Sequence, residues 1–174
     1  AVHALNKGFT WAWGADVSEK GFSFKNGLAI VPMHDSLIAQ HGKDSKGFNN
    51  PGADRTGAAF NQPMPEKDIT QALRQEAFDN YQTTDDHGMH ATGLYTDQLG
   101  NNYFKIKNSW GKANECDGYF YCSMPYFRYK TINIYLHKSA LPKEMAKKLG
   151  INQLLIVCAM RFSACSSDQA LELL

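Results

Sequence analysis

Two strand-like runs in the middle of the chain, residues 88–96 and 103–109, most constrain what this sequence can fold into. Both are rich in β-branched and aromatic residues, which favour strands. The segment DQLGNN between them supplies the Asp, Gly and Asn residues of a turn. Such a pair predicts a β-hairpin, because a short turn returns the second strand alongside the first. Two histidines, His87 and His90, lie at its start, and Asn108 lies near its end.

Further strands and two helices are expected around this hairpin. The segments WAWGADVS, GLAIV, GYFYCS and YKTINIYLH read as strands. A helix is predicted over 63–81, with Pro65 in its first turn and a stripe of Ile69, Leu73 and Ala77 facing the core. A second helix is predicted over 141–150, with Gly150 as its C-cap. Residues 41–62 read as a long surface loop. The sequence therefore predicts an α+β fold with most of its sheet in the second half.

Composition narrows the class of protein further. The 174 residues are enough for one domain, and 43% hydrophobic with 20% charged residues is typical of a globular chain. The net charge of +1 gives no strong field for nucleic acid or an anionic membrane, so neither is expected as a partner. The sequence contains no run of eighteen apolar residues, so it predicts no membrane-spanning helix. Six basic residues between 128 and 148 are interpreted as a solvated helix face.

The four cysteines do not form a metal or redox motif. Cys116 and Cys122 are separated by five residues, and Cys158 and Cys165 by six. Neither spacing is the C-x-x-C of a zinc or disulfide-exchange site, so free thiols are expected. Cys122 alternates with aromatic residues and is expected in the core.

A histidine and an asparagine near the hairpin can together supply general-base chemistry. Histidine exchanges protons near neutral pH, and a side-chain carbonyl such as that of Asn108 can fix its tautomer and orientation. Trp110 could shield the resulting hydrogen bond from water, which strengthens it. Histidine with an oriented Asn is the base half of a Cys-His-Asn site. Taken alone, these residues fit a structural role better, in which Asn108 caps a turn and both histidines are structural.

The segment KNSWG at 107–111, after an aromatic strand and before GYFYCS, resembles the Asn region of papain-like cysteine peptidases. The blocks WGADVSEKGFS, AFDNYQTTDDHGMH, YFKIKNSWG, DGYFYCSMPYFRYKTI and KSALPKEMAKKLG resemble, in order, the bleomycin hydrolase and aminopeptidase C family. The likeness runs from about Phe9 to Gly150. It implies a papain-like fold, of which residues 1–151 would form the C-terminal part, with an antiparallel barrel-like sheet.

The resemblance also selects His87 rather than His90 as the base. In this family the catalytic His begins a strand and a Gly follows six residues later, as Gly93 follows His87. A tight hairpin would instead place Asn108 opposite His90, so a longer or bulged connection is needed to bring His87 to Asn108. A metal site formed by Asp85, Asp86, His87 and His90 is the alternative. H-x-x-H on a strand points the two rings to opposite faces, which disfavours shared coordination. No metal and no cofactor are expected.

The expected nucleophile has no counterpart in this sequence. Papain-like peptidases carry their cysteine upstream of the histidine, whereas all four cysteines here lie downstream of Asn108. We therefore expect an N-terminal, nucleophile-bearing part to be missing and the chain alone to be inactive. The resemblance implies a thiol aminopeptidase that removes N-terminal residues from peptides, with this chain supplying His87 and Asn108. The alternative is a non-catalytic papain-like scaffold or interaction domain.

The last segment, 152–174, differs in character from the rest. In the family, the chain ends soon after a KKLG-like helix, and its terminal carboxylate holds the substrate's amino group. Here 23 residues follow Ile151, so we expect this tail to be foreign to the enzyme, with an extra helix as the alternative. The resemblance further implies a homo-oligomer, a hexamer, besides the peptide substrate and the missing N-terminal part. A cytoplasmic location is expected, with periplasmic or secreted locations open because the first residue is Ala1.

Overall fold

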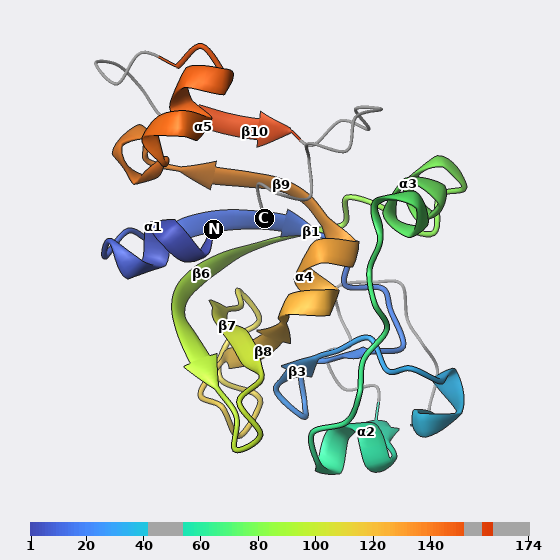
Figure 1. Ribbon diagram of the computed structural model, residues 1–174. Coiled ribbons are helices and arrows are strands. Elements are labelled where there is room, and N and C mark those ends of the chain that lie inside the picture. Colours follow the sequence, from blue (N-terminus) through green and yellow to red (C-terminus); the bar gives the residue numbers. More distant parts are fainter. Residues whose placement is uncertain (42–53, 152–157, 162–174) are drawn as a thin grey trace.

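One curved eight-stranded sheet forms the frame of the molecule in the computed structural model, which describes residues 1–41, 54–151 and 158–161 (Figure 1). The strand order is β10-β9-β1-β6-β7-β8-β3-β2, and β10 and β2 are the open edges. Neighbours run antiparallel, except that β3 and β8 are parallel. The strands are β1 (Trp11–Ala15), β2 (Phe22–Ser23), β3 (Leu28–Ala29), β6 (His87–Thr96), β7 (Asn102–Lys107), β8 (Tyr119–Ser123), β9 (Thr131–Leu136) and β10 (Cys158–Arg161), with β4 (Ala39–His41) and β5 (Asp54–Thr56) forming a separate pair.

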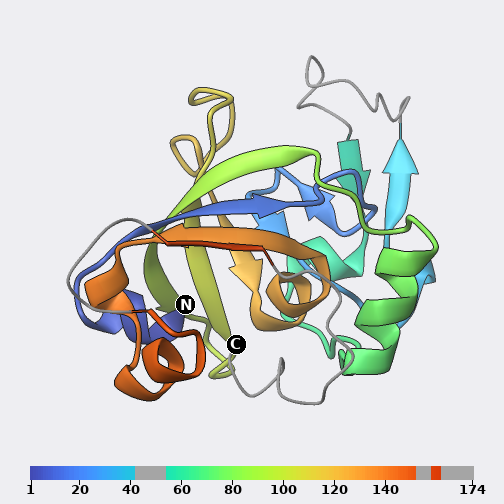
Figure 2. The ribbon, with the colours of Figure 1, turned by 90° about the horizontal axis from the view of Figure 1, so that it is seen from above.

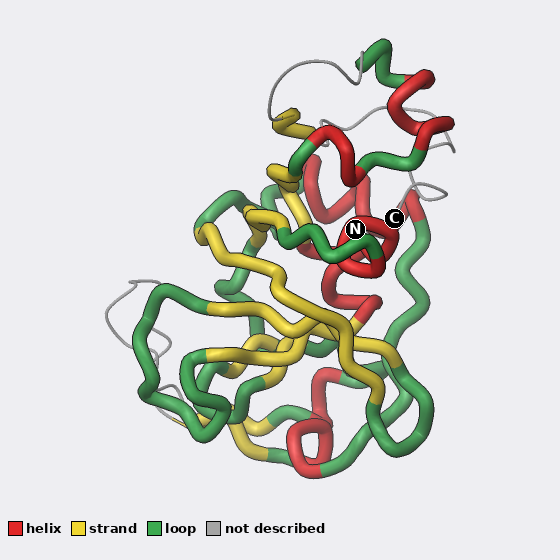
Figure 3. Tube along the Cα trace, turned by 90° about the vertical axis from the view of Figure 1, so that its left-hand side faces the viewer, coloured by secondary structure: helices red, strands yellow, loops and turns green. Residues whose placement is uncertain are grey.

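The helices are short and lie around this sheet. Seen from above, β6, β1 and β9 run side by side, and α3 stands beyond their ends (Figure 2). Figure 3 shows most helices gathered to one side of the strands. Within the described residues, no helix is long and apolar enough to cross a membrane. The helices are α1 (Val2–Asn6), α2 (Ala58–Asn61), α3 (Gln71–Asp79), α4 (Met124–Lys130) and α5 (Lys143–Lys148), with the 3-10 turns η1 (Asp35–Leu37) and η2 (Lys138–Ala140).

The core lies between the sheet and α4, and aromatic rings fill it. Phe127 of α4 packs on Phe104, Trp11 and Trp13, with ring centroids 4.6, 5.5 and 5.6 Å away. All four side chains are buried. Burying rings of this size is the largest hydrophobic contribution that a small domain can obtain per residue. The packing therefore fixes α4 against β1 and β7, the strands on either side of β6.

A one-residue bulge decides which face each side chain of β6 occupies. Tyr95 pairs with Tyr103 and Gly93 with Lys105, but Ala91 then pairs with Ile106, so Thr92 is the extra residue. The hydroxyl of Thr92 donates to the carbonyl oxygen of Lys105 at 3.1 Å. The predicted hairpin is confirmed. The connection needed to bring His87 to Asn108 is a bulge within the strand rather than a longer turn.

The first predicted helix starts later than expected. Helix α3 begins at Gln71, and the side chain of Thr70 caps it by accepting a hydrogen bond from the Leu73 amide. The segment 63–70 is not helical, because Glu66 is used elsewhere: its carboxylate accepts from the Val31 amide and from the Ser123 hydroxyl, both at 2.6 Å. A start at Pro65 was therefore wrong. The predicted C-terminal helix is confirmed as α5, with Gly150 at φ +64° just after it.

Helix α4 was not predicted, because the two predicted strands left residues 124–128 unassigned and placed Tyr129 and Lys130 in the second strand. Ser123 caps it by accepting from the Tyr126 amide at 3.2 Å. Its last carbonyl groups lack partners within the helix, as at every helix end. The guanidinium of Arg74 on α3 satisfies several, donating to the carbonyl oxygens of Arg128 at 3.0 Å and Thr131 at 2.7 Å. This bond pattern ties α3 to the junction between α4 and β9.

Two expectations fall mainly outside the described residues. The long loop 41–62 includes described elements only at its ends, where β5 and α2 replace the expected loop. Of the tail 152–174, the structure describes only 158–161, which pair as β10 with β9 in antiparallel register, Cys158 opposite Leu136. These four residues form a strand rather than the alternative extra helix. The foreign origin of the tail stays a prediction.

Two lysines of the expected solvated cluster are buried instead. Lys130, 2% exposed, ends α4, and Lys138, 8% exposed, follows β9. The ammonium group of Lys130 pairs with Glu19, lies 3.8 Å from a carboxylate oxygen of Asp16, and donates to the carbonyl oxygen of Gln82 at 2.7 Å. A lysine in the interior needs such partners, because an unpaired buried charge is strongly destabilising. The interpretation as a solvated face was wrong for these two residues.

The bulge predicts different effects of removing and adding one residue in β6. Deletion of Thr92 leaves Gly93 opposite Lys105 and Ala91 opposite Ile106, so the faces are kept and one hydrogen bond is lost, about 0.5–1.5 kcal/mol of the free energy of unfolding. Insertion of one alanine between His90 and Ala91 instead shifts the start of β6 by one residue, which exchanges its two faces and removes Met89 from the core. We expect the free energy of unfolding of this variant to fall by about 2–5 kcal/mol, as for loss of a buried methionine. Urea denaturation measures both, and equal stability of the two variants would contradict the assignment of the bulge.

Asp16 predicts a pH dependence of stability. Burial raises the pKa of its carboxyl from the ordinary 3.8 to about 6, so between these values the folded chain binds a proton that the unfolded chain has lost. The contribution of this group is therefore fully present below pH 3.8 and is lost as pH rises through about 6. A two-unit shift corresponds to about 3 kcal/mol at most. Urea denaturation of wild type and Asp16→Asn across pH 4–7 should give a difference that changes with pH, and a constant difference would contradict this pKa.

Candidate functional site

His87 and Asn108 lie in direct contact at one end of the β6–β7 hairpin. The Nε2 atom of His87 is 2.7 Å from Oδ1 of Asn108. Both side chains are buried, with 8% of His87 and 3% of Asn108 exposed. The expected contact is present, and His90 does not take this position. The catalytic role of the pair stays a prediction.

The bulge explains why His87, and not His90, lies on the buried face of the sheet with Asn108. Past Thr92, His90 pairs with Lys107, so the next pair along the two strands would be Met89 and Asn108. Directly opposed residues of an antiparallel pair point to the same face, and alternate residues along β6 share it. His87, Met89 and Asn108 therefore lie on the buried face, whereas His90 is exposed. Without the bulge, His90 would stand opposite Asn108.

The hydrogen bonds of Asn108 assign the tautomer of His87. The backbone amide of Ser109 donates to Oδ1 of Asn108 at 2.7 Å, which shows that the oxygen of the side-chain amide faces this direction. A carbonyl oxygen only accepts, so Nε2 of His87 must carry the proton. Nδ1 is then the basic nitrogen of the neutral ring. Asn108 Nδ2 is buried without a partner among the described residues, at a cost of about 1–3 kcal/mol.

Trp110 covers the hydrogen bond from one side. Its ring stacks on His87, with centroids 4.7 Å apart and planes 27° from parallel. Phe22 and Phe24 meet the same indole edge-on, at 5.9 and 5.4 Å. An apolar ring against the imidazole lowers the local dielectric constant and strengthens the bond between His87 and Asn108. Trp110 therefore lies where it can shield this bond, and its supporting role stays a prediction.

The loop that presents Trp110 depends on glycine at a close backbone contact. Gly118 has φ +82°, and a Cβ atom there would lie 2.4 Å from the carbonyl oxygen of Gly111. Asn114 pins the loop by donating to the carbonyl oxygens of Phe24 at 2.8 Å and Tyr119 at 2.7 Å. The Gly118 carbonyl oxygen in turn accepts from the Asn108 amide at 3.0 Å. The loop therefore holds both Asn108 and Trp110.

Carboxylates hold the segment before His87 to the end of β1. Asp86 accepts from the Val17 amide at 2.9 Å and from the Ser18 hydroxyl at 2.5 Å. Asp16 accepts from the Thr84 amide at 3.0 Å. Asp86 is thus a structural hydrogen-bond acceptor. As expected, His87 and His90 lie on opposite faces of β6, with His87 buried and His90 exposed. Sequence analysis missed Asp16 and Lys130 at this site, although an acidic D-x-x-E segment directly after β1 was a usable signal.

The two cysteines whose side chains the structure describes are poorly suited to act as nucleophiles. Cys122 is fully buried on β8, which β7 separates from β6, and burial raises the pKa of its thiol well above the ordinary value. Burial also raises the pKa of Cys116. A nucleophilic cysteine instead needs a lowered pKa beside its histidine. The core position predicted for Cys122 is confirmed.

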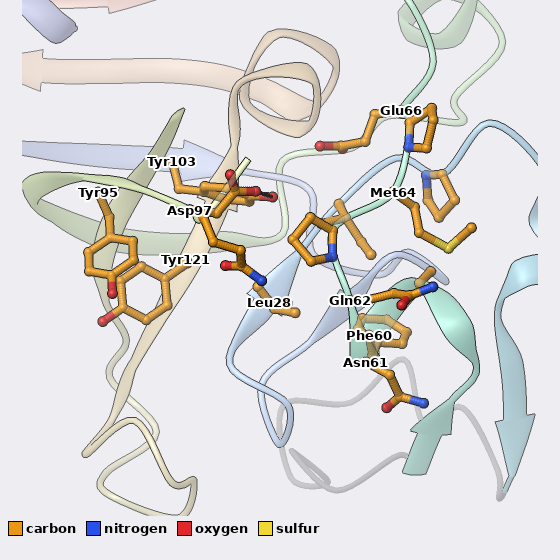
Figure 4. A pocket seen from close by; sticks show the side chains of 16 residues that line it. Leu28, Phe60, Asn61, Gln62, Met64, Glu66, Tyr95, Asp97, Tyr103 and Tyr121 are labelled. Carbon is orange, nitrogen blue, oxygen red and sulfur yellow. Dashed lines mark hydrogen bonds between the residues drawn. The ribbon is translucent and has the colours of Figure 1, made fainter. Parts of the chain in front are cut away.

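A separate cavity of about 230 Å³ lies at the other end of β6 (Figure 4). Tyr95, Tyr103 and Tyr121 stand on one side of it, and Phe60 and Met64 stand on the other. Its charged lining residues are Glu66 and Asp97. Tyr95 is near the last residue of β6, whereas His87 is the first. This cavity is therefore distinct from the contact between His87 and Asn108.

Comparisons with known proteins identify the fold and the family of this chain. Residues 61–158, more than half of the chain, match the Peptidase C1-like family. Among solved structures, the chain is similar to PepW from Lactobacillus rhamnosis HN001, with 21% sequence identity and a TM-score of 0.52. That match covers 86% of this chain and 28% of the PepW chain, so the chain spans less than a third of PepW. No match was found among curated proteins. The α+β papain-like fold is confirmed, and the chain belongs to the Peptidase C1-like family.

Proposed function

We propose that this chain supplies the base half of the Cys-His-Asn site of a thiol aminopeptidase, with His87 as the base and Asn108 as its orienting partner. The observation that carries the proposal is the buried 2.7 Å contact between Nε2 of His87 and Oδ1 of Asn108, stacked under Trp110. A buried histidine whose ring is fixed on one side by an uncharged acceptor presents its other nitrogen in a defined direction. Membership of the Peptidase C1-like family supports the same chemistry.

The proposed mechanism follows from the tautomer of His87. Nδ1 accepts the proton of a cysteine thiol, and the imidazolium formed is held by the Asn108 oxygen at Nε2. The thiolate attacks the peptide carbonyl and forms a tetrahedral intermediate. Collapse of this intermediate breaks the peptide bond as Nδ1 returns the proton to the leaving amine. Water, deprotonated by His87, then releases the acyl group and regenerates the thiol.

The nucleophile is proposed to come from a part of the enzyme outside this chain. The raised thiol pKa values of Cys116 and Cys122 support this assignment, as does the position of Cys122 on β8. Removal of N-terminal residues, rather than cleavage within a peptide, rests on the likeness of the sequence blocks to bleomycin hydrolase and aminopeptidase C. The hexameric assembly and the cytoplasmic location stay predictions.

Substitution of the two histidines separates their roles. In the complete enzyme, His87→Ala should lower kcat for an aminoacyl-amide substrate by at least about 10³-fold, because both proton transfers are lost. His90→Ala is the matched control: its ring is exposed on the opposite face of the same strand, so most of the activity should remain. Steady-state kinetics measure both. A large loss in His90→Ala with an active His87→Ala would overturn the assignment.

The chain alone should not hydrolyse aminoacyl-amide substrates, because neither described cysteine is placed beside His87. We expect no thiol-dependent release of product above background from the purified 174-residue chain. The measurement is a chromogenic aminoacyl-anilide assay with and without iodoacetamide. Turnover that iodoacetamide abolishes, and that disappears in Cys116→Ala or Cys122→Ala, would show that the nucleophile lies in this chain.

A further inference from the structure

The segment 82–86, which leads into His87, belongs to no helix or strand. Two backbone groups within it are bonded to side chains from other elements. The Gln82 carbonyl oxygen accepts from the ammonium group of Lys130 at 2.7 Å, and the Thr84 amide donates to Asp16 at 3.0 Å. The hydroxyl of Thr83 also accepts from Lys130, at 3.0 Å. The path of the chain into His87 is therefore set by side chains.

Lys130 is the cation on which these contacts converge. Its ammonium group pairs with Glu19, lies 3.8 Å from Asp16, and contacts the ring of Tyr129 at 4.4 Å. The side chains of Lys130 and Asp16 are each 3% exposed, and that of Glu19 is 30% exposed. Two carboxylates this close together need a cation between them, because like charges in a buried site repel strongly.

Asp16 and Asp86 connect the loop after β1 with the segment before His87. Ala15, the last residue of β1, pairs with His87, and Asp16 follows it directly. Asp86 precedes His87 and accepts from the Val17 amide at 2.9 Å. A displacement of Asp16 would thus move the end of β1 and the start of β6 together. Any such movement changes the 2.7 Å contact between His87 and Asn108, because Asn108 follows β7 and is not part of the moving segments.

We infer that Lys130 is a positioning residue for His87, because its ammonium group holds the segment 82–86 against the loop after β1 and so keeps Nε2 on Asn108. Its importance for catalysis rests on the proposed function, whereas its effect on the geometry of the ring does not. Lys130 does not touch substrate or the reacting atoms. It acts through the backbone of residues 82–84.

The test is the tautomer of His87, read from the ¹⁵N chemical shifts of its ring in the complete chain. Wild type should populate the Nε2–H form, and Lys130→Met should lower the ratio of the Nε2–H to the Nδ1–H form by about fivefold or more, the effect of losing one hydrogen bond. Lys138→Met is the matched control, because Lys138 is also buried but lies beyond the other end of β9. Its ring spectrum should be that of wild type.

A role limited to overall stability predicts a different result. It would lower the melting temperature of Lys130→Met and leave the His87 spectrum of the folded protein unchanged, which would overturn the inference. Should Lys130→Met fail to fold, Asp16→Asn/Lys130→Met removes the uncompensated charge with the cation, and its spectrum is compared with that of Asp16→Asn, so that the change at Asp16 is common to both. A ring spectrum of the double variant equal to that of Asp16→Asn overturns the inference, and a lower ratio of the Nε2–H to the Nδ1–H form supports it.

The proposed function is tested separately from this inference. If His87→Ala leaves the complete enzyme active, the proposed function fails, but the tautomer measurement still reports whether Lys130 holds the ring. If the proposed function holds, Lys130→Met should lower kcat while leaving KM nearly unchanged. Lys138→Met should leave both constants as in wild type.

Discussion

The bulge at Thr92 is the constraint on which the rest of the site depends. One extra residue in β6 shifts its first half by one position against β7 and so exchanges the two faces of that half. Because of this exchange, His87 and Met89 point inward with Asn108, and His90 points to solvent. The energetic basis is the core itself, since the unshifted register would expose Met89 and Ala91, both of which are buried. The hydrophobic packing of the sheet therefore also selects the histidine.

The bulge places His87 on the right face, and two further groups of contacts fix its ring. Asn108, Ser109 and Trp110 act on the ring from the loop after β7, through two hydrogen bonds and a stacked indole. Asp16, directly after β1, and Lys130, at the end of α4, act on the backbone before it. The first group determines which nitrogen is basic. The second determines where that nitrogen lies relative to the sheet.

Local patterns in the sequence were sufficient for the hairpin and for α5. The choice of His87 over His90 came from the family resemblance, because a tight hairpin alone would place His90 opposite Asn108. Local patterns failed where tertiary contacts override local preference. Glu66 looked like an acidic residue of a first helical turn, but its carboxylate accepts hydrogen bonds from Val31 and Ser123, and α3 begins only at Gln71. The residues of α4 have the aromatic composition of a strand, and the helix forms because Phe127 fills the core and Arg74 caps its end. Ser123 and Pro125 gave a helix-start signal that this composition concealed.

Lys130 shows most clearly why charge patterns are difficult to interpret from a sequence. It lies in a basic stretch, which usually indicates a solvated face, yet its partners Glu19 and Gln82 are far away along the chain. A lysine buried among apolar residues alone would lose its charge or destabilise the fold. Here the surrounding acceptors are the carbonyl oxygen and hydroxyl of the segment before His87 and the carboxylates after β1. These acceptors stabilise the buried ammonium group of Lys130. The same groups must stay in place for His87 to contact Asn108.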